Sequence, residues 1–430
     1  MKYLRRFQVK TNQIIFKYKI YIRSSFIYLF SSFLSAAIGI AINPFMAKNL
    51  SPEEYAIIGY FQSFNLIILP ILNFSLISYY LRNYYIIPNS RRQIVADTIL
   101  IALLVYGFVA LVVVCITFYF YCQWSKVSFP FFPCALLTFA PIYLQNIVTL
   151  YLVNCRLKRE AGKYSKVIIF NAIFSAFFGI LLVVIWKFGA TGRLLATLFA
   201  TAVTAVYCFK QIFGKFQFDF SVIKSAFRFA WPLSLSAILM YFLSGVDRAM
   251  LERLNDSYTL GFYNVGIQMA GFLVIFYTAI TLTFEPDIYK AIAENKKRKL
   301  AKIIGGIITL NVLPNLVFIA LAPLIIGLLT YNRYTEASGF AQILALKNIT
   351  VSFYYAVIVI IVGYGFTKSE LMIRLIGALL CIMMYKLLIG QFGFYGAAWG
   401  QVLSFIIMAT IGMLFLFNKY NQKKLIIKKR

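Results

Sequence analysis

The sequence predicts an all-α integral membrane protein with about twelve transmembrane helices. Of its 430 residues, 62% are hydrophobic, and these residues form long stretches separated by short polar connections. One helical passage through a bilayer core needs roughly 20 apolar residues, and soluble globular domains are much less apolar than this chain. The spans are therefore expected at residues 24–47, 55–80, 94–120, 128–153, 166–186, 190–213, 229–251, 258–284, 303–329, 339–365, 369–389 and 393–417.

The basic residues predict the orientation of these spans. The two termini and every second connection hold 33 of the 42 lysines and arginines. Because positively charged connections stay in the cytoplasm, we expect a basic cytoplasmic N-terminal segment at 1–23 and a basic cytoplasmic tail at 418–430. This topology, together with attraction to anionic membrane lipids, accounts for the net charge of +29 without a nucleic-acid partner.

A weak internal repeat divides the spans into two sets of six. Residues 46–60 (MAKNLSPEEYAIIGY) follow the first span, and residues 250–263 (MLERLNDSYTLGFY) follow the seventh. Both segments run from Met through Leu and a polar turn to Tyr, Gly and Tyr at similar spacing. The matching loop charges give both halves the same orientation, as in parallel repeats related by an axis along the membrane normal. We therefore expect an N-lobe at 24–214 and a C-lobe at 215–417.

The residue types that the sequence lacks argue against an enzyme. It contains no histidine, which is the commonest general base and metal ligand. Its 13 acidic residues form no paired carboxylate motif, and no glycine-rich phosphate loop occurs. Neither a catalytic residue, a metal nor a cofactor is expected, and transport between the helices is the function that remains.

Several short motifs resemble those of a family of membrane exporters. Residues 227–266 (FRFAWPLSLSAILMYFLSGVDRAMLERLNDSYTLGFYNVG) combine an aromatic-Pro-Leu helix start, an Asp-Arg pair and a Gly-x-Tyr that opens the next helix. Similar motifs lie at Asn43-Pro44, 50–55, 285–289 and 392–399. On these motifs the chain resembles the Wzx-type polysaccharide flippases of the multidrug/oligosaccharidyl-lipid/polysaccharide (MOP) exporter superfamily.

The resemblance implies a fold, an activity and a location. The fold would be two six-helix lobes arranged as a V, similar to MATE transporters. The activity would be alternating-access transfer of undecaprenyl-pyrophosphate-linked oligosaccharide repeat units from the cytoplasmic to the outer leaflet, for O-antigen or capsular polysaccharide assembly. The location would be the bacterial inner membrane, and a polysaccharide polymerase or chain-length complex is a candidate partner.

Such a substrate requires a cationic, hydrogen-bonding path, because unpaired polar groups are costly in hydrocarbon. Lys347 lies inside span ten, and Thr350 and Tyr354 follow it on the same helical face. The alternative is that Lys347 extends its ammonium group to the membrane surface. The amide side chains of spans one, two and eight either line a sugar path or join helices by hydrogen bonds; they are Asn43, Gln62, Asn65, Asn264 and Gln268.

Four further charged residues are candidates for a gate or for ion coupling. Asp247 and Arg248 close span seven, where they could equally form a structural cap. Arg374 and Lys386 bracket the apolar centre of span eleven, from which each could also reach its own membrane surface. A proton or sodium gradient is the hypothesised energy source, because the chain has no nucleotide-binding motif.

Three other functions stay open. A drug/cation antiporter of the same superfamily would be expected to carry an acidic ion site in the N-lobe, and span one has no acidic residue. A lipid II-type flippase is a closer alternative, although that branch typically has fourteen spans. A membrane-embedded glycan polymerase or ligase is the most distant, because it would require a large external loop.

Overall fold

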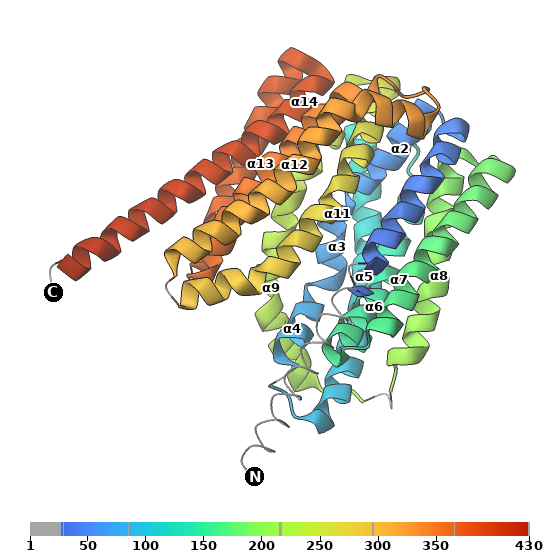
Figure 1. Cartoon of the computed structure of the whole chain (residues 1–430). Coiled ribbons are helices and arrows are strands. Elements are labelled where there is room, and N and C mark those ends of the chain that lie inside the picture. Colours follow the sequence, from blue (N-terminus) through green and yellow to red (C-terminus); the bar gives the residue numbers. More distant parts are fainter. Residues whose placement is uncertain are drawn as a thin grey trace, which may run out of the picture.

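The computed structural model describes residues 27–28, 30–84, 86–214, 217–294, 296–364 and 366–428. Helices account for nearly all of these residues, and no strand occurs among them (Figure 1). The basic N-terminal segment 1–23 and the last two residues of the basic tail lie outside this described part. Below, the first half means residues 30–214 and the second half residues 217–428.

The first half begins with the helix Phe30–Asn49. Its further helices are α2 (Pro52–Ser63), α3 (Asn65–Asn73), α4 (Leu76–Asn83), the short η1 (Asn89–Arg91), α5 (Arg92–Ser125), α6 (Cys134–Lys158), α7 (Ala161–Gly179), its π-helical extension η2 (Ile180–Ile185) and α8 (Gly189–Ile212). The second half contains α9 (Phe220–Ser244), α10 (Val246–Leu251), η3 (Glu252–Leu254), α11 (Ser257–Ala293), α12 (Lys297–Thr330), α13 (Ala337–Gly363) and α14 (Thr367–Lys428).

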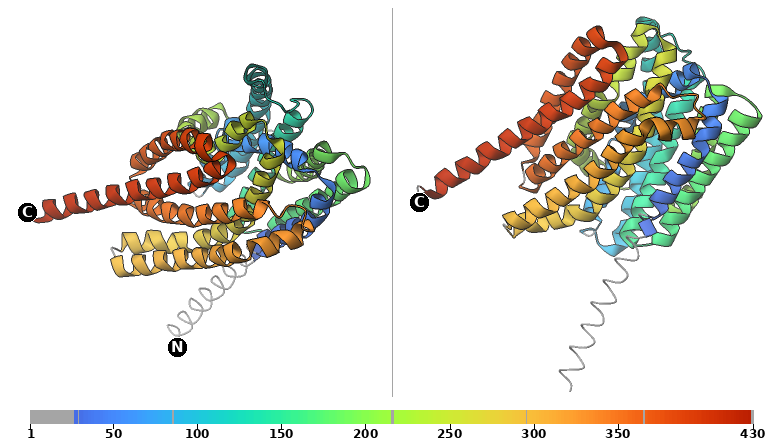
Figure 2. Two further views of the ribbon diagram at one scale, coloured as in Figure 1. Left: turned by 90° about the horizontal axis from the view of Figure 1, so that it is seen from above. Right: turned by 45° about the horizontal axis from the view of Figure 1, so that its top comes forward.

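Ten helices of the described residues are long and apolar enough to cross a membrane, which confirms a multi-pass membrane protein. Predicted spans eleven and twelve are the two arms of α14, because the chain turns back at Gly393, where φ is 55° (Figure 2). The second arm continues beyond the predicted end at 417 into the basic tail, whose Lys and Gln residues favour helix.

The structure breaks two predicted spans into shorter helices. Span two is divided into α2, α3 and α4, and the last break coincides with left-handed backbone at Phe74 (φ 43°) and Ser75 (φ 50°). Span seven is divided by Gly245, which ends α9 and starts the short helix α10. Hydropathy averaged over a whole span does not show these breaks, although polar residues such as Asn73, Ser75 and Ser244 flank them.

The hydrophobic core has two parts. The larger cluster joins residues of both halves, such as Phe61 and Leu72 with Tyr263 and Phe340. The smaller cluster belongs to the first half and the beginning of α9, and extends from Leu76 to Ala230. In Figure 1, α11 to α14 correspondingly diverge from α5 to α8 toward the lower end of the molecule. The halves therefore share a core at one end; at the other, α11 to α14 separate from α5 to α8, whereas the beginning of α9 still packs against the first half.

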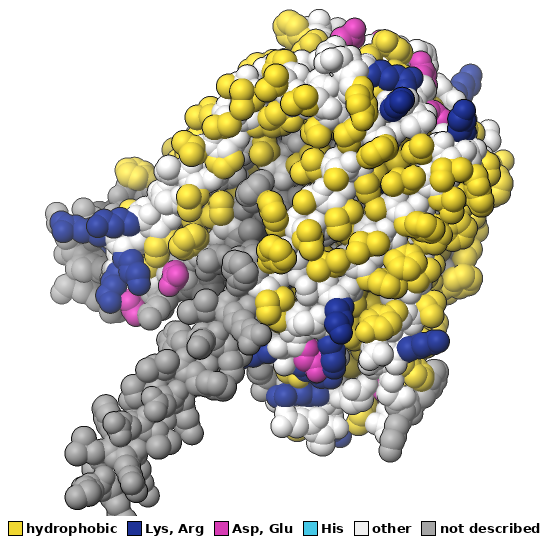
Figure 3. Space-filling model, turned by 45° about the vertical axis from the view of Figure 1, so that its right-hand side comes forward, with side chains coloured by type: hydrophobic (Ala, Val, Ile, Leu, Met, Phe, Trp, Pro, Cys, Tyr) yellow, Lys and Arg dark blue, Asp and Glu magenta, His cyan; other side chains and the backbone are white. Residues whose placement is uncertain are grey.

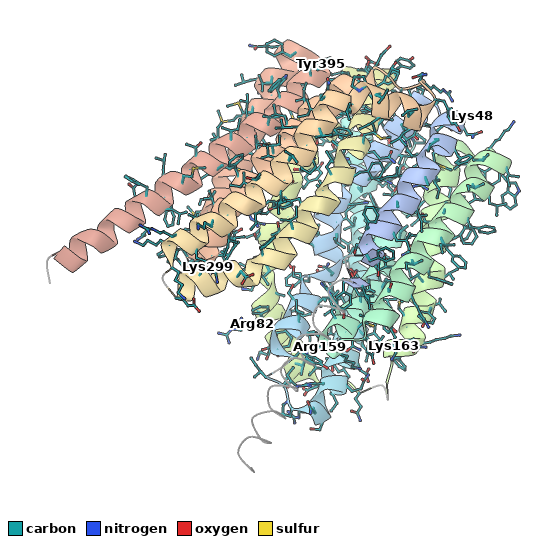
Figure 4. All side chains as sticks on the ribbon, viewed as in Figure 1. Lys48, Arg82, Arg159, Lys163, Lys299 and Tyr395 are labelled. Atoms are coloured by element: carbon teal, nitrogen blue, oxygen red, sulfur yellow. The ribbon has the colours of Figure 1, made fainter. Side chains whose placement is uncertain are left out.

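The two ends of the molecule are distinguished below by one residue each. Lys48 marks the end at which the halves share a core, and Arg159 marks the opposite end, where Arg82 and Lys163 also lie (Figure 4). Lys299 lies at the lower end of the diverging helices α11 to α14. On the face shown in Figure 3, hydrophobic side chains cover the middle, and Lys, Arg, Asp and Glu gather toward the two ends. This distribution suits a protein whose middle contacts hydrocarbon and whose ends contact water.

The connection between the halves is attached to α5. Asp97, which is buried, accepts hydrogen bonds from Gly214 N (3.1 Å) and Gln93 Nε2 (2.8 Å). Farther along, Thr98 Oγ1 accepts one from Asp219 N (3.1 Å). Hydrogen bonds from the side chain and backbone of Ser221 lower the pKa of the Asp219 carboxyl group, which caps α9. The start of α9 is therefore positioned by the first half of the chain.

Candidate functional site

A polar cavity of about 530 Å³ lies between the two halves. The helix Phe30–Asn49, α2, α7 and α8 form one side, and α10 and α11 form the other. Its polar lining consists of Ser35, Asn43, Tyr55, Gln62, Asn171, Ser175, Arg193, Arg248, Asn264 and Gln268. Two of these side chains are arginines, and none of the described lining residues is acidic. The cavity therefore carries net positive charge.

The start of α8 positions Arg193. Gly189 opens this helix with φ at 59°, and an added Cβ atom would lie 1.7 Å from Glu54 Oε1, so glycine is required there. Glu54 accepts hydrogen bonds from Ala190 N (3.1 Å) and Ser51 N (2.7 Å), which joins the beginnings of α2 and α8. Arg193 follows one turn later, half-buried, and its side chain makes no hydrogen bond or ion pair within the described chain. Its guanidinium group is thus available to a ligand.

Arg248 approaches the cavity from the second half and is held by backbone. Its Nη2 donates to Ser244 O (3.0 Å) and its Nη1 to Gly59 O (3.4 Å), which crosses to the first half. Its Nε lies 3.8 Å from Asp247 Oδ1. The Asp247 carboxylate is fully buried.

Three helices converge on Asp247. Its Oδ2 accepts hydrogen bonds from Tyr263 Oη of α11 (2.7 Å) and Gln401 Nε2 of α14 (2.9 Å). Gln401 Nε2 also donates to Tyr263 Oη (3.1 Å). Because Asp247 neighbours Arg248 in sequence and space, this network orients the arginine. A fully buried carboxylate requires such compensation.

Four of the five predicted amide residues line the cavity. Gln268 Nε2 donates to Asn43 Oδ1 (3.1 Å), and Asn43 Nδ2 donates to Leu329 O (3.4 Å). Asn264 packs against Gly59, and both polar atoms of its amide are buried without a hydrogen-bond partner in the described chain. Gln62 also lines the cavity, whereas Asn65 does not. Unsatisfied buried amides are costly, which makes Asn264 a good ligand-binding candidate.

The predicted residues of span ten lie elsewhere. Lys347 does not line the cavity, but it interacts electrostatically with Asp247 and Arg248. Thr350 Oγ1 bonds to the Lys347 carbonyl oxygen (2.8 Å). Tyr354 is fully buried and packs against Phe405 of α14, with 5.7 Å between ring centroids. Thr350 and Tyr354 thus belong to the interior of the second half, and a role for Lys347 stays a prediction.

The two charges of span eleven have different surroundings. Arg374 pairs with Glu370 one turn earlier in α14, and both side chains are largely buried. Lys386 is exposed on the same helix. Neither residue lines the cavity, and their proposed part in gating stays a prediction.

Arg193 and Asn171 were not among the residues selected from the sequence. Arg193 had been counted as a loop charge, because it lies only four residues into α8. Asn171 lies well inside predicted span five, so its position among apolar residues could have revealed it. In the described part of the chain, no group of three or more Cys, Asp or Glu side chains could hold a metal ion.

The helices and the buried polar cavity define a multi-pass membrane protein with the fold of the MOP superfamily. An inward-facing multidrug resistance MATE family transporter of that superfamily superimposes with a TM-score of 0.74 and 14% identity, over 93% of this chain and 99% of that chain. The lipid II flippase MurJ, in an inward closed conformation, gives a TM-score of 0.68 and 15% identity, over 91% of this chain and 87% of that chain. These likenesses confirm the MATE-like fold.

The chain belongs to the polysaccharide biosynthesis protein family, whose pattern matches residues 21–286. An uncharacterized membrane protein of Methanocaldococcus jannaschii is 22% identical over 214 residues, which are 49% of this chain and 48% of that protein. The match thus spans about half the length of this curated relative.

Proposed function

We propose that this protein transfers a diphosphate-linked, membrane-anchored oligosaccharide across the bilayer, as a flippase rather than an enzyme. The observation that carries the proposal is the cavity between the halves, with Arg193 and Arg248 and no described acidic lining residue. The polysaccharide biosynthesis family supports a glycan substrate. The lipid II flippase MurJ, a fold neighbour, supports a lipid-linked one.

The cavity chemistry suits such a substrate. A diphosphate needs cationic donors, and the planar guanidinium group binds phosphate oxygens with two parallel hydrogen bonds. Sugar hydroxyl groups need amide donors and acceptors, which Asn43, Asn264 and Gln268 provide. Because these residues come from both halves, a bound substrate would contact both sides of any opening between them.

The same charge pattern disfavours the antiporter alternative. A multidrug MATE transporter is a fold neighbour, so export of cationic drugs deserves comparison. A cationic ligand would be repelled by Arg193 and Arg248, and the cavity offers it no described carboxylate. We therefore favour an anionic substrate such as an undecaprenyl-pyrophosphate-linked repeat unit of O-antigen or capsule.

We propose two six-helix lobes, 24–214 and 215–417, that alternate their opening, with this conformation closed at the Lys48 end. There Arg333 Nη1 donates to Lys48 O (2.6 Å), and Tyr334 Oη donates to Leu50 O (2.7 Å). Ser128 N donates to Glu252 Oε1 (2.7 Å), which also joins the two halves. These bonds connect the halves and would have to break for the Lys48 end to open.

We further propose that the Arg159 end faces the cytoplasm of a bacterial inner membrane. Reporter fusions would test this topology. Alkaline phosphatase, which is active only outside the cytoplasm, should be active after Lys48 and inactive after Arg298. A fluorescent protein that folds only in the cytoplasm should give the reverse pattern. Activity of the phosphatase at Arg298 would contradict the proposed orientation.

Lipid analysis of cells that lack the protein tests the function. We expect mass spectrometry to show accumulation of a polyprenyl-diphosphate oligosaccharide, which restoring the gene removes. Purified protein in liposomes should then move the same lipid between leaflets, faster with an imposed proton or sodium gradient if that gradient drives transport. No accumulation, together with increased sensitivity to cationic dyes, would favour the drug antiporter instead.

A further inference from the structure

A second cavity, separate from the polar one, is an apolar groove of about 450 Å³. It lies between α3 and α5 of the first half and α9 and α10 of the second. Ile67, Ile71 and Val114 line it from the first half, and Val246 and Met250 line it from the second. The groove borders the part of α5 whose Val113, Ile116 and Phe120 side chains are exposed on a membrane-spanning helix. It is therefore accessible to lipid chains.

Aromatic rings join the two halves at this groove. Phe64 of the first half stacks on Tyr241 of the second, with ring centroids 5.4 Å apart. Phe64 also packs edge-on against Phe118 (4.7 Å), and Phe118 packs against Tyr121 (5.6 Å). The width of the groove consequently depends on how closely the halves approach.

One end of the groove is polar and positively charged. Arg253 is the charged residue among those that line it, and it is exposed and makes no ion pair within the described chain. The adjacent Glu252 forms no ion pair with Arg253 in the described chain, and its carboxylate accepts a hydrogen bond from Ser128 N. Tyr121 and Tyr241 also line the groove. The guanidinium group of Arg253 thus offers donors to an anion.

We propose that the groove binds an anionic phospholipid, with one acyl chain along the apolar walls and the phosphate beside Arg253. An apolar groove does not hold water well, whereas basic residues next to the bilayer attract anionic headgroups. Because both halves form its walls, the lipid binds best when they are close together at the Lys48 end. By linkage, the bound lipid stabilises that arrangement.

Native mass spectrometry of the purified full-length protein tests this site. The protein would be equilibrated with phosphatidylglycerol and phosphatidylethanolamine of identical acyl chains. We expect preferential retention of phosphatidylglycerol. Arg253→Gln should lower the ratio of the two bound lipids at least threefold, because it removes the charge and keeps the polarity. Lys187→Gln, which changes an exposed charge at the same end outside the groove, should leave the ratio unchanged.

A groove-filling variant provides the second measurement. Thr117→Trp extends a side chain from α5 into the groove and should abolish the retained lipid. Val246→Trp fills it from α10 and replaces Thr117→Trp if that variant is not monodisperse. Equal binding of both lipids, or retention that neither the charge nor the filling variants alter, overturns the proposal. Retention of polyprenyl phosphate in place of phosphatidylglycerol also overturns it. Since the readout is lipid binding, it does not depend on the transported substrate.

Discussion

Arg193→Gln is expected to reduce transfer of the lipid-linked glycan at least tenfold without changing the amount of protein in the membrane. The guanidinium group lines the cavity and makes no hydrogen bond or ion pair within the described chain, so its loss removes a ligand contact rather than a structural one. A hydrogen bond to a charged group contributes about 1.5–3 kcal/mol, and each 1.4 kcal/mol corresponds to about a tenfold change in affinity. The measurement is the rate of transfer in proteoliposomes.

Two variants control this experiment. Arg193→Lys keeps the positive charge but loses the planar pair of donors, so we expect intermediate activity. Lys187→Gln removes an exposed charge close by in sequence and should transfer the lipid at the normal rate. Normal transfer by Arg193→Gln would exclude a substrate contact for this residue and weaken the proposed function.

Asp247→Ala is expected to lower both the stability and the transport activity of the protein. The substitution leaves Tyr263 and Gln401 without their shared acceptor and removes the carboxylate beside Arg248. A buried donor left unsatisfied costs about 1–3 kcal/mol, so the apparent melting temperature in detergent should fall by several degrees. Transport should fall further than stability explains, because Arg248 loses the carboxylate beside its Nε atom and keeps only its two backbone contacts at the cavity.

Asp287→Ala is the matched control, since it removes an exposed carboxylate from α11. Its melting temperature and transfer rate should stay close to those of the unaltered protein. Asp247→Asn distinguishes the effect of the negative charge from that of the hydrogen bond. The asparagine keeps one acceptor for Tyr263 but carries no charge. An Asp247→Ala protein as stable as Asp287→Ala would contradict the importance of the three-helix network.

The sequence predicted correctly those features of the fold that depend on one helix at a time. The apolar stretches predicted the membrane class and the spans, because bilayer thickness alone sets their length. The reversal between spans eleven and twelve was placed correctly, and Gly393 at φ 55° explains it. The break at Gly245 was missed, since hydropathy does not report the backbone geometry of apolar residues.

The candidate site was harder to predict. Asn264 was selected as one of the amide side chains within the spans that could line a sugar path, and it does line the cavity. Arg193 was passed over because it lies at the very start of predicted span six (190–213) and was counted with the charges of the adjoining loop. Tyr354 was selected for sharing a helical face with Lys347, yet it packs against Phe405 inside the second half. Periodicity indicates which residues share a face, but not which neighbouring helix covers that face.

The sequence by itself determined the class of protein and most of its apolar spans, because both depend on composition and local order along the chain; the division of the spans into two similar sets stays a prediction. Only the tertiary structure decided which polar side chains meet. Asn43 and Gln268 are separated by 225 positions and join in one hydrogen bond, and Arg193 and Arg248 approach one cavity from opposite halves. Contacts of this kind depend on how whole helices pack against one another. The sequence of a single span does not indicate which other helix it packs against.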